Sequence, residues 1–213
     1  MSHNTWIHRI ARVAVRPLVA SAVTPNQITS LRLGAGIVAA AAFALGTETA
    51  LAWGAGLFAV SMVLDRADGE LARLSGKTSP LGHKFDLVSD AFCNALAFIG
   101  LGIGLRDSPL GLWSLPMGAA AGLAIALILW LVIKLEGDGG ERAAELPGLA
   151  GFDADDAMLL VPLAIWFGLA QGLLVAAAVG APLFALLMYV VLRRRPARSL
   201  KARTLDQAPA RRG

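Results

Sequence analysis

Four aspartates in two pairs are the residues of this sequence best suited to chemistry. Asp65 and Asp68 are three positions apart, and Asp86 and Asp90 are four positions apart, so each pair projects from one face of a helix. Two such faces turned toward each other gather four carboxylates in a small volume, where like charges must bind protons or share cations. Oxygen ligands without His or Cys favour hard ions such as Mg²⁺ or Mn²⁺. The pattern therefore predicts a two-metal site beside a phosphate ester.

Small residues and one arginine accompany the aspartates. Gly69 follows Asp68 directly, Ala72 comes one turn later, and Gly82 lies near the start of the next predicted helix. Missing side chains at these positions leave room for an extended ligand against the backbone. Arg73 could pair with a phosphate oxygen or hold an aspartate in place.

The composition places this site in a membrane protein. The chain of 213 residues is 56% hydrophobic and has a mean hydropathy of +0.64, far above the values of soluble domains. The net charge of +4 is better explained by Lys and Arg that mark the cytosolic side of a membrane than by nucleic-acid binding. Cys93 is the single cysteine, which excludes a disulfide within the chain and a cysteine-based metal site.

Six apolar helices are expected to position the aspartates, which predicts an all-α, polytopic membrane fold. Their predicted ranges are about 27–45, 51–65, 81–105, 112–135, 157–169 and, after a turn at 171–172, a last helix up to 192. We expect residues 25–192 to form one membrane domain, with a polar, acidic loop at 136–156. In this domain Gly34, Gly36, Gly54 and Gly56 are expected to permit close contact between helices.

The two ends of the sequence are basic. Residues 1–24 place Trp6, Ile7 and Ile10 on one side of a helix and three arginines on another, a pattern typical of an amphipathic helix in the membrane interface. Residues 193–213 are expected to form a basic cytosolic tail.

Charge asymmetry predicts the orientation. Six spans put both termini on one side, and of the nineteen Lys and Arg only Arg106 falls in a predicted loop on the other side, so the side rich in basic residues is expected to be cytosolic. Helices that ended at the carboxylates would be short: residues 51–64 would measure about 21 Å, against a hydrocarbon core of about 30 Å. We therefore expect the aspartates to lie several ångströms inside the cytosolic leaflet, in a polar cavity.

The aspartate stretch resembles the full signature of the CDP-alcohol phosphatidyltransferase family. The matching pattern is Asp65-x-x-Asp68-Gly69-x-x-Ala72-Arg73, eight residues, Gly82, three residues, Asp86, three residues, Asp90. The resemblance implies an enzyme of phospholipid synthesis in the cytoplasmic (inner) membrane, which transfers a phosphoryl-alcohol unit from a CDP-linked donor to a hydroxyl acceptor and releases CMP. The resemblance also implies that the protein forms a homodimer, although no residue pattern in the sequence supports or opposes this.

The resemblance further assigns roles to single residues. It implies that Asp65, Asp68 and Asp86 bind two divalent ions, and that Asp90 touches one ion and acts as the general base. The residues implied to shape the nucleotide and donor pocket are Gly69, Ala72, Arg73 and Gly82, with a first-helix motif of Asn26, Thr29 and Arg32 near the donor phosphates.

The expected acceptor follows from one position at which this sequence departs from the family pattern. Members that use a phosphorylated acceptor often carry Lys or Arg directly after the last aspartate, where this sequence has Ala91. Because a phosphate without a nearby cation is poorly held, we expect an unphosphorylated acceptor: an amino alcohol, a polyol or a lipid alcohol. Lys84 is a candidate acceptor-binding residue, and His83 beside it could also supply charge.

Three alternatives compete with this interpretation. The first is a CDP-choline or CDP-ethanolamine phosphotransferase that acts on a lipid alcohol such as diacylglycerol, which reverses the partners. The second is an Mg²⁺-dependent prenyltransferase, which the Asp68-Gly69 and Ala72-Arg73 pairs disfavour. The third is a small transporter with acidic residues on an ion path, which would move ions without releasing CMP.

Overall fold

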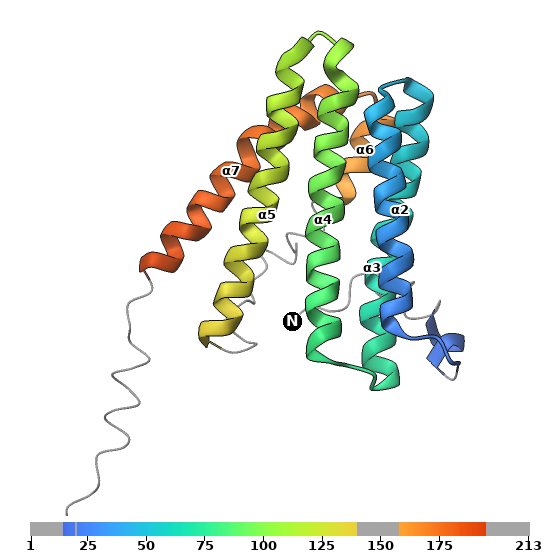
Figure 1. The fold of residues 1–213 in the computed structure, drawn as a ribbon. Coiled ribbons are helices and arrows are strands. Elements are labelled where there is room, and N and C mark those ends of the chain that lie inside the picture. Colours follow the sequence, from blue (N-terminus) through green and yellow to red (C-terminus); the bar gives the residue numbers. More distant parts are fainter. Residues whose placement is uncertain (1–14, 20, 140–157, 195–213) are drawn as a thin grey trace, which may run out of the picture.

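The structure, a computed structural model, describes residues 15–19, 21–139 and 158–194 (Figure 1). Every regular element within these ranges is a helix, which confirms the predicted all-α class. The elements are α2 (Pro25–Leu45), α3 (Glu48–Ser75), α4 (Pro80–Gly104), the 3-10 turns η1 (Leu105–Asp107) and η2 (Gly111–Trp113), α5 (Ser114–Gly139), α6 (Leu160–Trp166) and α7 (Ala170–Arg194).

Five helices in the described ranges are long and apolar enough to cross a membrane: α2, α3, α4, α5 and α7. The predicted fifth span, about 157–169, coincides with α6, which has only seven residues. The described residues therefore support a polytopic membrane protein with five spans of full length and do not confirm a count of six. The predicted acidic loop at 136–156 begins later than expected, because α5 continues to Gly139. The rest of that loop, residues 1–14 and the tail beyond 194 lie outside the described residues.

Local sequence explains where the helices begin. Pro25 occupies the first turn of α2, where its missing N–H costs nothing. Thr47 Oγ1 accepts a hydrogen bond from the Ala50 N–H at 3.2 Å, and Ser79 Oγ accepts one from the Gly82 N–H at 3.0 Å. These side chains satisfy donors that a helix start leaves unpaired, so they fix the first turns of α3 and α4.

The predicted end of the second helix at Asp65 was wrong, whereas the predicted third helix, about 81–105, agrees with α4. Helix α3 continues beyond Asp65 to Ser75 and stops at Gly76, whose φ of 66° is left-handed, and α4 begins at Pro80, ahead of Asp86. The polar residues from Asp65 to Ser75 do not break α3, because neither Gly69 nor the charged side chains prevent the backbone hydrogen bonds. From Asp68 to the end of α3 is about two turns, roughly 10 Å at 1.5 Å per residue. The aspartates therefore lie well inside the helices.

Two glycines allow α2, α3 and α4 to pack closely against one another. A Cβ atom on Gly36 would collide with Cys93 Sγ of α4, and one on Gly54 would lie 2.8 Å from the Phe43 ring. Gly34 has no atom within 4 Å, and Gly56 only the Trp166 ring at 4.0 Å. The predicted role in close helix contact is thus confirmed for Gly36 and Gly54 and wrong for the other two.

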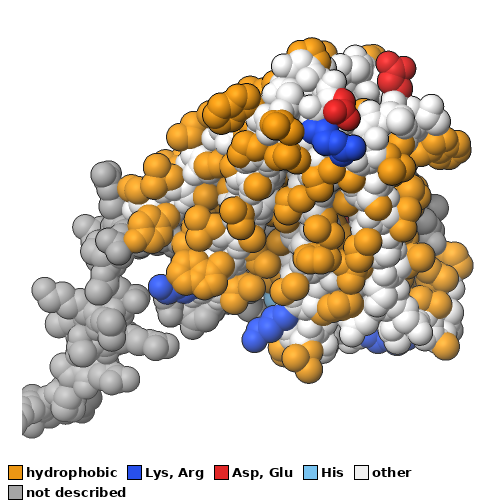
Figure 2. Space-filling view, turned by 45° about the horizontal axis from the view of Figure 1, so that its top comes forward, with side chains coloured by type: hydrophobic (Ala, Val, Ile, Leu, Met, Phe, Trp, Pro, Cys, Tyr) orange, Lys and Arg blue, Asp and Glu red, His pale blue; other side chains and the backbone are white. Residues whose placement is uncertain are grey.

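Helix packing places the aspartate-bearing ends of α3 and α4 beside the start of α2, at the lower end of the bundle in Figure 1. Helix α5 packs on α4, α7 packs on α5, and α6 packs on α3. Hydrophobic side chains cover most of the visible flank of the bundle in Figure 2, as a lipid-facing surface requires.

The end of the predicted interfacial segment packs on the bundle. Residues 15–19 are helical, and Val15 is buried against Ile28 of α2 and Leu71 of α3. This contact holds the segment beside the carboxylate-bearing end of α3.

Candidate active site

Three carboxylates from two helices meet in one place. Asp65 and Asp68 of α3 and Asp86 of α4 each offer an oxygen within 4.8 Å of the others, as the spacing predicted. Asp68 is buried, with 2% of its surface exposed. Its Oδ1 and the Oδ1 of Asp86 are buried and form no hydrogen bond. Buried carboxylate oxygens without donors are costly, and a hard divalent cation is the partner that oxygen ligands of this kind prefer.

A hydroxyl from the first helix fixes one of these carboxylates. Thr29 of α2 is buried, and its Oγ1 donates a hydrogen bond of 2.6 Å to Asp68 Oδ2. Since one oxygen of Asp68 is held by this bond, the orientation of its other oxygen is set as well. Thr29 was predicted to bind the donor, and the structure places it on a metal-ligand candidate.

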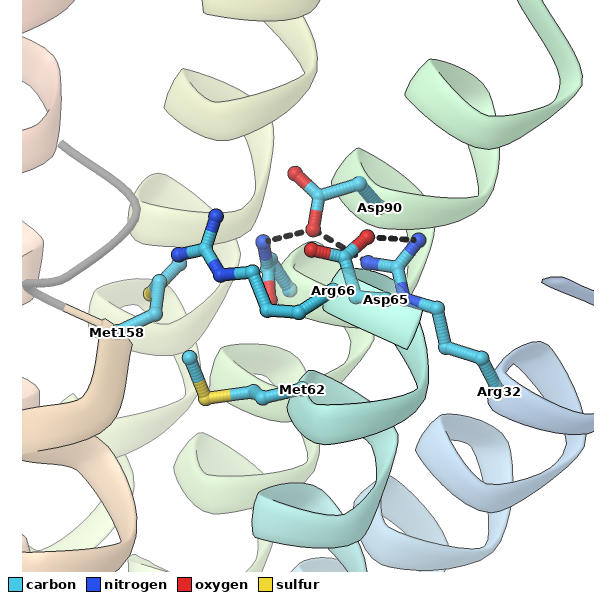
Figure 3. A pocket seen from close by; sticks show the side chains of 7 residues that line it. Arg32, Met62, Asp65, Arg66, Asp90 and Met158 are labelled. Atoms are coloured by element: carbon cyan, nitrogen blue, oxygen red, sulfur yellow. Dashed lines mark hydrogen bonds and ion pairs between the residues drawn. The ribbon is translucent and has the colours of Figure 1, made fainter. Parts of the chain in front are cut away.

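Arg32 occupies the centre of the carboxylate group. Its side chain is 2% exposed, and its Nη1 lies 3.1 Å from Asp65 Oδ1 and 3.6 Å from Asp86 Oδ1. Its Nη2 contacts Asp90 Oδ1, and Figure 3 shows Asp65 and Asp90 turned toward the guanidinium group. A single cation therefore joins carboxylates from both helices, which the sequence did not predict.

Asp90 stands outside the three-carboxylate cluster. Its Oδ1 also accepts a hydrogen bond from Asn94 Nδ2 at 3.0 Å, and its side chain is 39% exposed. It borders a pocket between α3, α4 and the chain just before α6 (Figure 3). The residues that line this pocket are Arg32, Met62, Asp65, Arg66, Asp90, Asn94 and Met158.

The small residues of the signature leave one side of α3 open. A Cβ on Gly69 would meet only Arg73 Nη2, at 3.8 Å, and Ala72 is half-buried. Arg73 is exposed; its Nε donates to the Gly69 carbonyl at 3.3 Å, and its Nη2 lies 3.2 Å from Glu70 Oε1. The predicted room for a ligand is thus present beside Gly69.

Gly82 has a different role from Gly69. A Cβ at this position would lie 2.9 Å from Ser79 Oγ and 3.1 Å from Asn26 Oδ1. Its missing side chain therefore allows the start of α4 to approach the start of α2. Asn26 is exposed at that junction, where a polar ligand can reach it.

Sequence reasoning missed several residues of this site. Lys84, the predicted acceptor residue, is exposed near the start of α4 and does not line the pocket beside Asp90. Four side chains line this pocket without having been predicted as site residues: Met62, Arg66, Asn94 and Met158. Asn94 follows Asp90 by one helical turn and could have been found from that spacing. Met158 is distant from the aspartates in the sequence, and no sequence pattern relates it to them.

Comparison with known proteins identifies the family. The profile described as CDP-alcohol phosphatidyltransferase matches residues 22–181, which include every helix from α2 to α6. The chain belongs to the CDP-alcohol phosphatidyltransferase family. Its fold resembles that of Mycobacterium tuberculosis phosphatidylinositol phosphate synthase (PgsA1), solved with CDP-DAG bound, with a TM-score of 0.63 and 22% identity over 84% of this chain and 93% of that one.

Two curated relatives match about half of the sequence. Both are named bifunctional IPC transferase and DIPP synthase. The protein of Thermococcus kodakarensis is 35% identical over 95 residues, 45% of this chain and 21% of its own. The protein of Rubrobacter xylanophilus is 34% identical over 92 residues, 41% of this chain and 19% of its own. The match thus spans about a fifth of each relative's length.

Proposed function

We propose that this protein transfers a phosphatidyl group from a CDP-linked lipid, CDP-diacylglycerol, to the hydroxyl of an acceptor alcohol and releases CMP. The observation that carries the proposal is the cluster of Asp65, Asp68 and Asp86, whose oxygens lie within 4.8 Å of one another next to the open side of Gly69. The fold likeness to a synthase solved with CDP-DAG supports the choice of donor.

The carboxylates would hold two Mg²⁺ or Mn²⁺ ions. Asp65, Asp68 and Asp86 are the proposed ligands, with Asp90 as a further ligand to one ion, and the buried Oδ1 atoms of Asp68 and Asp86 fit this role because they form no hydrogen bond. Bound ions would neutralise the diphosphate of the donor and the charge that develops on departing CMP.

The protein residues would position the two substrates. Gly69, Ala72 and Gly82 would leave the nucleotide close to the backbone, while Arg73 and Asn26, both exposed at this end of the bundle, would donate hydrogen bonds to it. Asp90 would take the proton from the acceptor hydroxyl, because a hydroxyl is a weak nucleophile at neutral pH. Asn94 would orient Asp90 through the bond to Oδ1.

The acceptor would enter the pocket beside Asp90. This pocket combines the guanidinium groups of Arg32 and Arg66 and the amide of Asn94 with the thioether side chains of Met62 and Met158. Ala91, directly after Asp90, contributes no charge. Because the position after Asp90 carries no Lys or Arg, the proposed acceptor is an unphosphorylated hydroxyl compound: an amino alcohol, a polyol or a lipid alcohol.

The site would face the cytosol from the cytoplasmic membrane. Lys77 lies between α3 and α4 and Lys84 in the first turns of α4, at the end of the bundle that carries the aspartates, whereas Arg106 lies in η1 after the far end of α4, 3.6 Å from Asp107. More basic residues on the side of the site favour that orientation.

A homodimer would be tested by light scattering of the purified protein.

The test is CMP release by purified protein in detergent or vesicles. With Mn²⁺ and CDP-diacylglycerol, CMP should form only when a suitable acceptor from a panel of phosphorylated and unphosphorylated alcohols is present. CMP from CDP-choline and diacylglycerol, but not from CDP-diacylglycerol, would instead establish the reversed partners. No CMP from either donor with any acceptor would contradict the proposal.

A further inference from the structure

Arg32 is the buried cation nearest to the four signature aspartates. It is 2% exposed and contacts Asp65, Asp86 and Asp90 from a helix that carries none of these carboxylates. Its backbone is fixed, because Ser61 Oγ of α3 donates to the Arg32 carbonyl at 3.1 Å and Gly36 packs against Cys93 one turn further along α2. The guanidinium therefore lies among the carboxylates through the packing of the bundle.

The contacts of Arg32 with the carboxylates and the binding of divalent ions to the same carboxylates weaken each other. A guanidinium about 3 Å from the ligand oxygens repels an ion that approaches the same oxygens, because Coulomb interactions in a partly dry site are large. Without any cation, the carboxylates would repel one another across the interface of α3 and α4. Either kind of cation relieves this repulsion, and each weakens the binding of the other.

We propose that Arg32 is the internal counter-ion of the metal-free site and that divalent ions compete with it for Asp65, Asp86 and Asp90. This inference rests on the proposed metal site. On metal binding, the guanidinium is released from at least one carboxylate and becomes free to contact an anionic group of the donor. Arg32 is thus a positioning residue, which keeps α2, α3 and α4 together until the ions arrive.

The test uses the full chain, purified in detergent and stripped with a chelator. Binding of Mn²⁺ is measured by electron paramagnetic resonance, and thermal unfolding is recorded with and without Mn²⁺. The variants are Arg32→Gln, which removes the charge, and Arg32→Lys, which keeps it on a compact ammonium group without the planar, five-donor fork of arginine. The matched control is Arg106→Gln, which removes an exposed arginine at the opposite end of the bundle.

Competition predicts that Arg32→Gln binds Mn²⁺ about tenfold more tightly than wild type, while its metal-free form unfolds at a lower temperature. Arg32→Lys should shift both quantities in the same directions by less, and Arg106→Gln should shift neither. Folding of Arg32→Gln only in the presence of Mn²⁺ would also support the proposal. If Arg32→Gln folds in neither condition, the Mn²⁺ affinity and the unfolding temperature of Arg32→Lys test the proposal.

Unchanged or weaker Mn²⁺ affinity in the folded Arg32 variants would overturn the counter-ion role while leaving the proposed transferase intact. Absence of Mn²⁺ binding to wild type would overturn both. No substrate or turnover is involved, so these two failures are distinguishable.

Discussion

Thr29 of α2 donates a 2.6 Å hydrogen bond to Asp68 of α3, a residue 39 positions away in the sequence. Both residues are 2% exposed, so the bond joins two helices inside the bundle and aims one carboxylate of the proposed metal site. Replacing Thr29 by Val removes the donor and keeps the shape, which leaves Asp68 Oδ2 without this partner.

We expect Thr29→Val to lower the free energy of unfolding by about 1–3 kcal/mol and to weaken Mn²⁺ binding. Thermal unfolding and metal titration of the metal-free protein measure the two effects. Thr29→Ser retains the hydroxyl and should restore Mn²⁺ affinity. Equal affinity in Thr29→Val and wild type would show that the bond does not orient Asp68 for metal.

Asp90 is held by Arg32 and Asn94 at the edge of the pocket. If it takes the acceptor proton, Asp90→Asn should reduce kcat by about 10²–10⁴-fold, while CDP-donor binding stays within a few-fold of wild type. Single-turnover CMP release and equilibrium binding of the donor separate the two quantities. Wild-type turnover in Asp90→Asn would contradict the assignment of the base.

Asn94→Leu tests the orientation of Asp90. This variant should lower kcat more than it raises KM, because the Asp90 carboxylate loses the donor that orients it toward the acceptor hydroxyl while the pocket keeps its other walls. Asn94→Asp puts a like charge beside Asp90 and should shift the pH profile of kcat to higher pH. An unchanged pH profile in Asn94→Asp would show that the amide has no influence on the base.

Gly69 faces open space, since a Cβ there would meet only Arg73 Nη2 at 3.8 Å. A larger side chain should therefore occupy the proposed nucleotide pocket without disturbing the fold. We expect Gly69→Leu to abolish donor binding and to unfold within a few degrees of wild type, with a smaller loss of binding in Gly69→Ala. Retained binding of CDP-diacylglycerol in Gly69→Leu, measured by calorimetry, would place the nucleotide elsewhere.

Gly36 and Gly34 provide a matched pair on α2. A Cβ on Gly36 would collide with Cys93 of α4, and one on Gly34 would touch nothing within 4 Å. Gly36→Ala should destabilise the protein by about 1–3 kcal/mol, whereas Gly34→Ala should be neutral or slightly stabilising, because alanine favours a helix over glycine. Comparable unfolding of the two variants in a denaturant titration would argue against close packing of α2 on α4.

The sequence allowed the carboxylate cluster to be predicted, because helical spacing determines which side chains share a face. Asp65, Asp68 and Asp86 meet as the spacing requires. The end of α3 was misjudged, because polarity was used as a stop signal, whereas the helix continues to its cap at Gly76. The predicted third helix, about 81–105, agrees with α4 to one residue at each end.

The position of Arg32 among the carboxylates depends on tertiary packing and was not predictable. Its reach is set by the approach of α2 to α4 at Gly36 and Cys93. Likewise, the pocket beside Asp90 includes Met158 from a distant part of the chain, and no local pattern relates it to the aspartates.

The central claim, that the aspartates form a metal site at the point of phosphatidyl transfer, is tested most directly by Mn²⁺ binding to purified Asp68→Asn and Asp86→Asn. Each should lose most Mn²⁺ affinity and all detectable CMP release from CDP-diacylglycerol, because each removes a negatively charged ligand. The control Asp107→Asn, at an 86% exposed side chain of the opposite end, should match wild type in both. Wild-type Mn²⁺ affinity in Asp68→Asn and Asp86→Asn would contradict the claim.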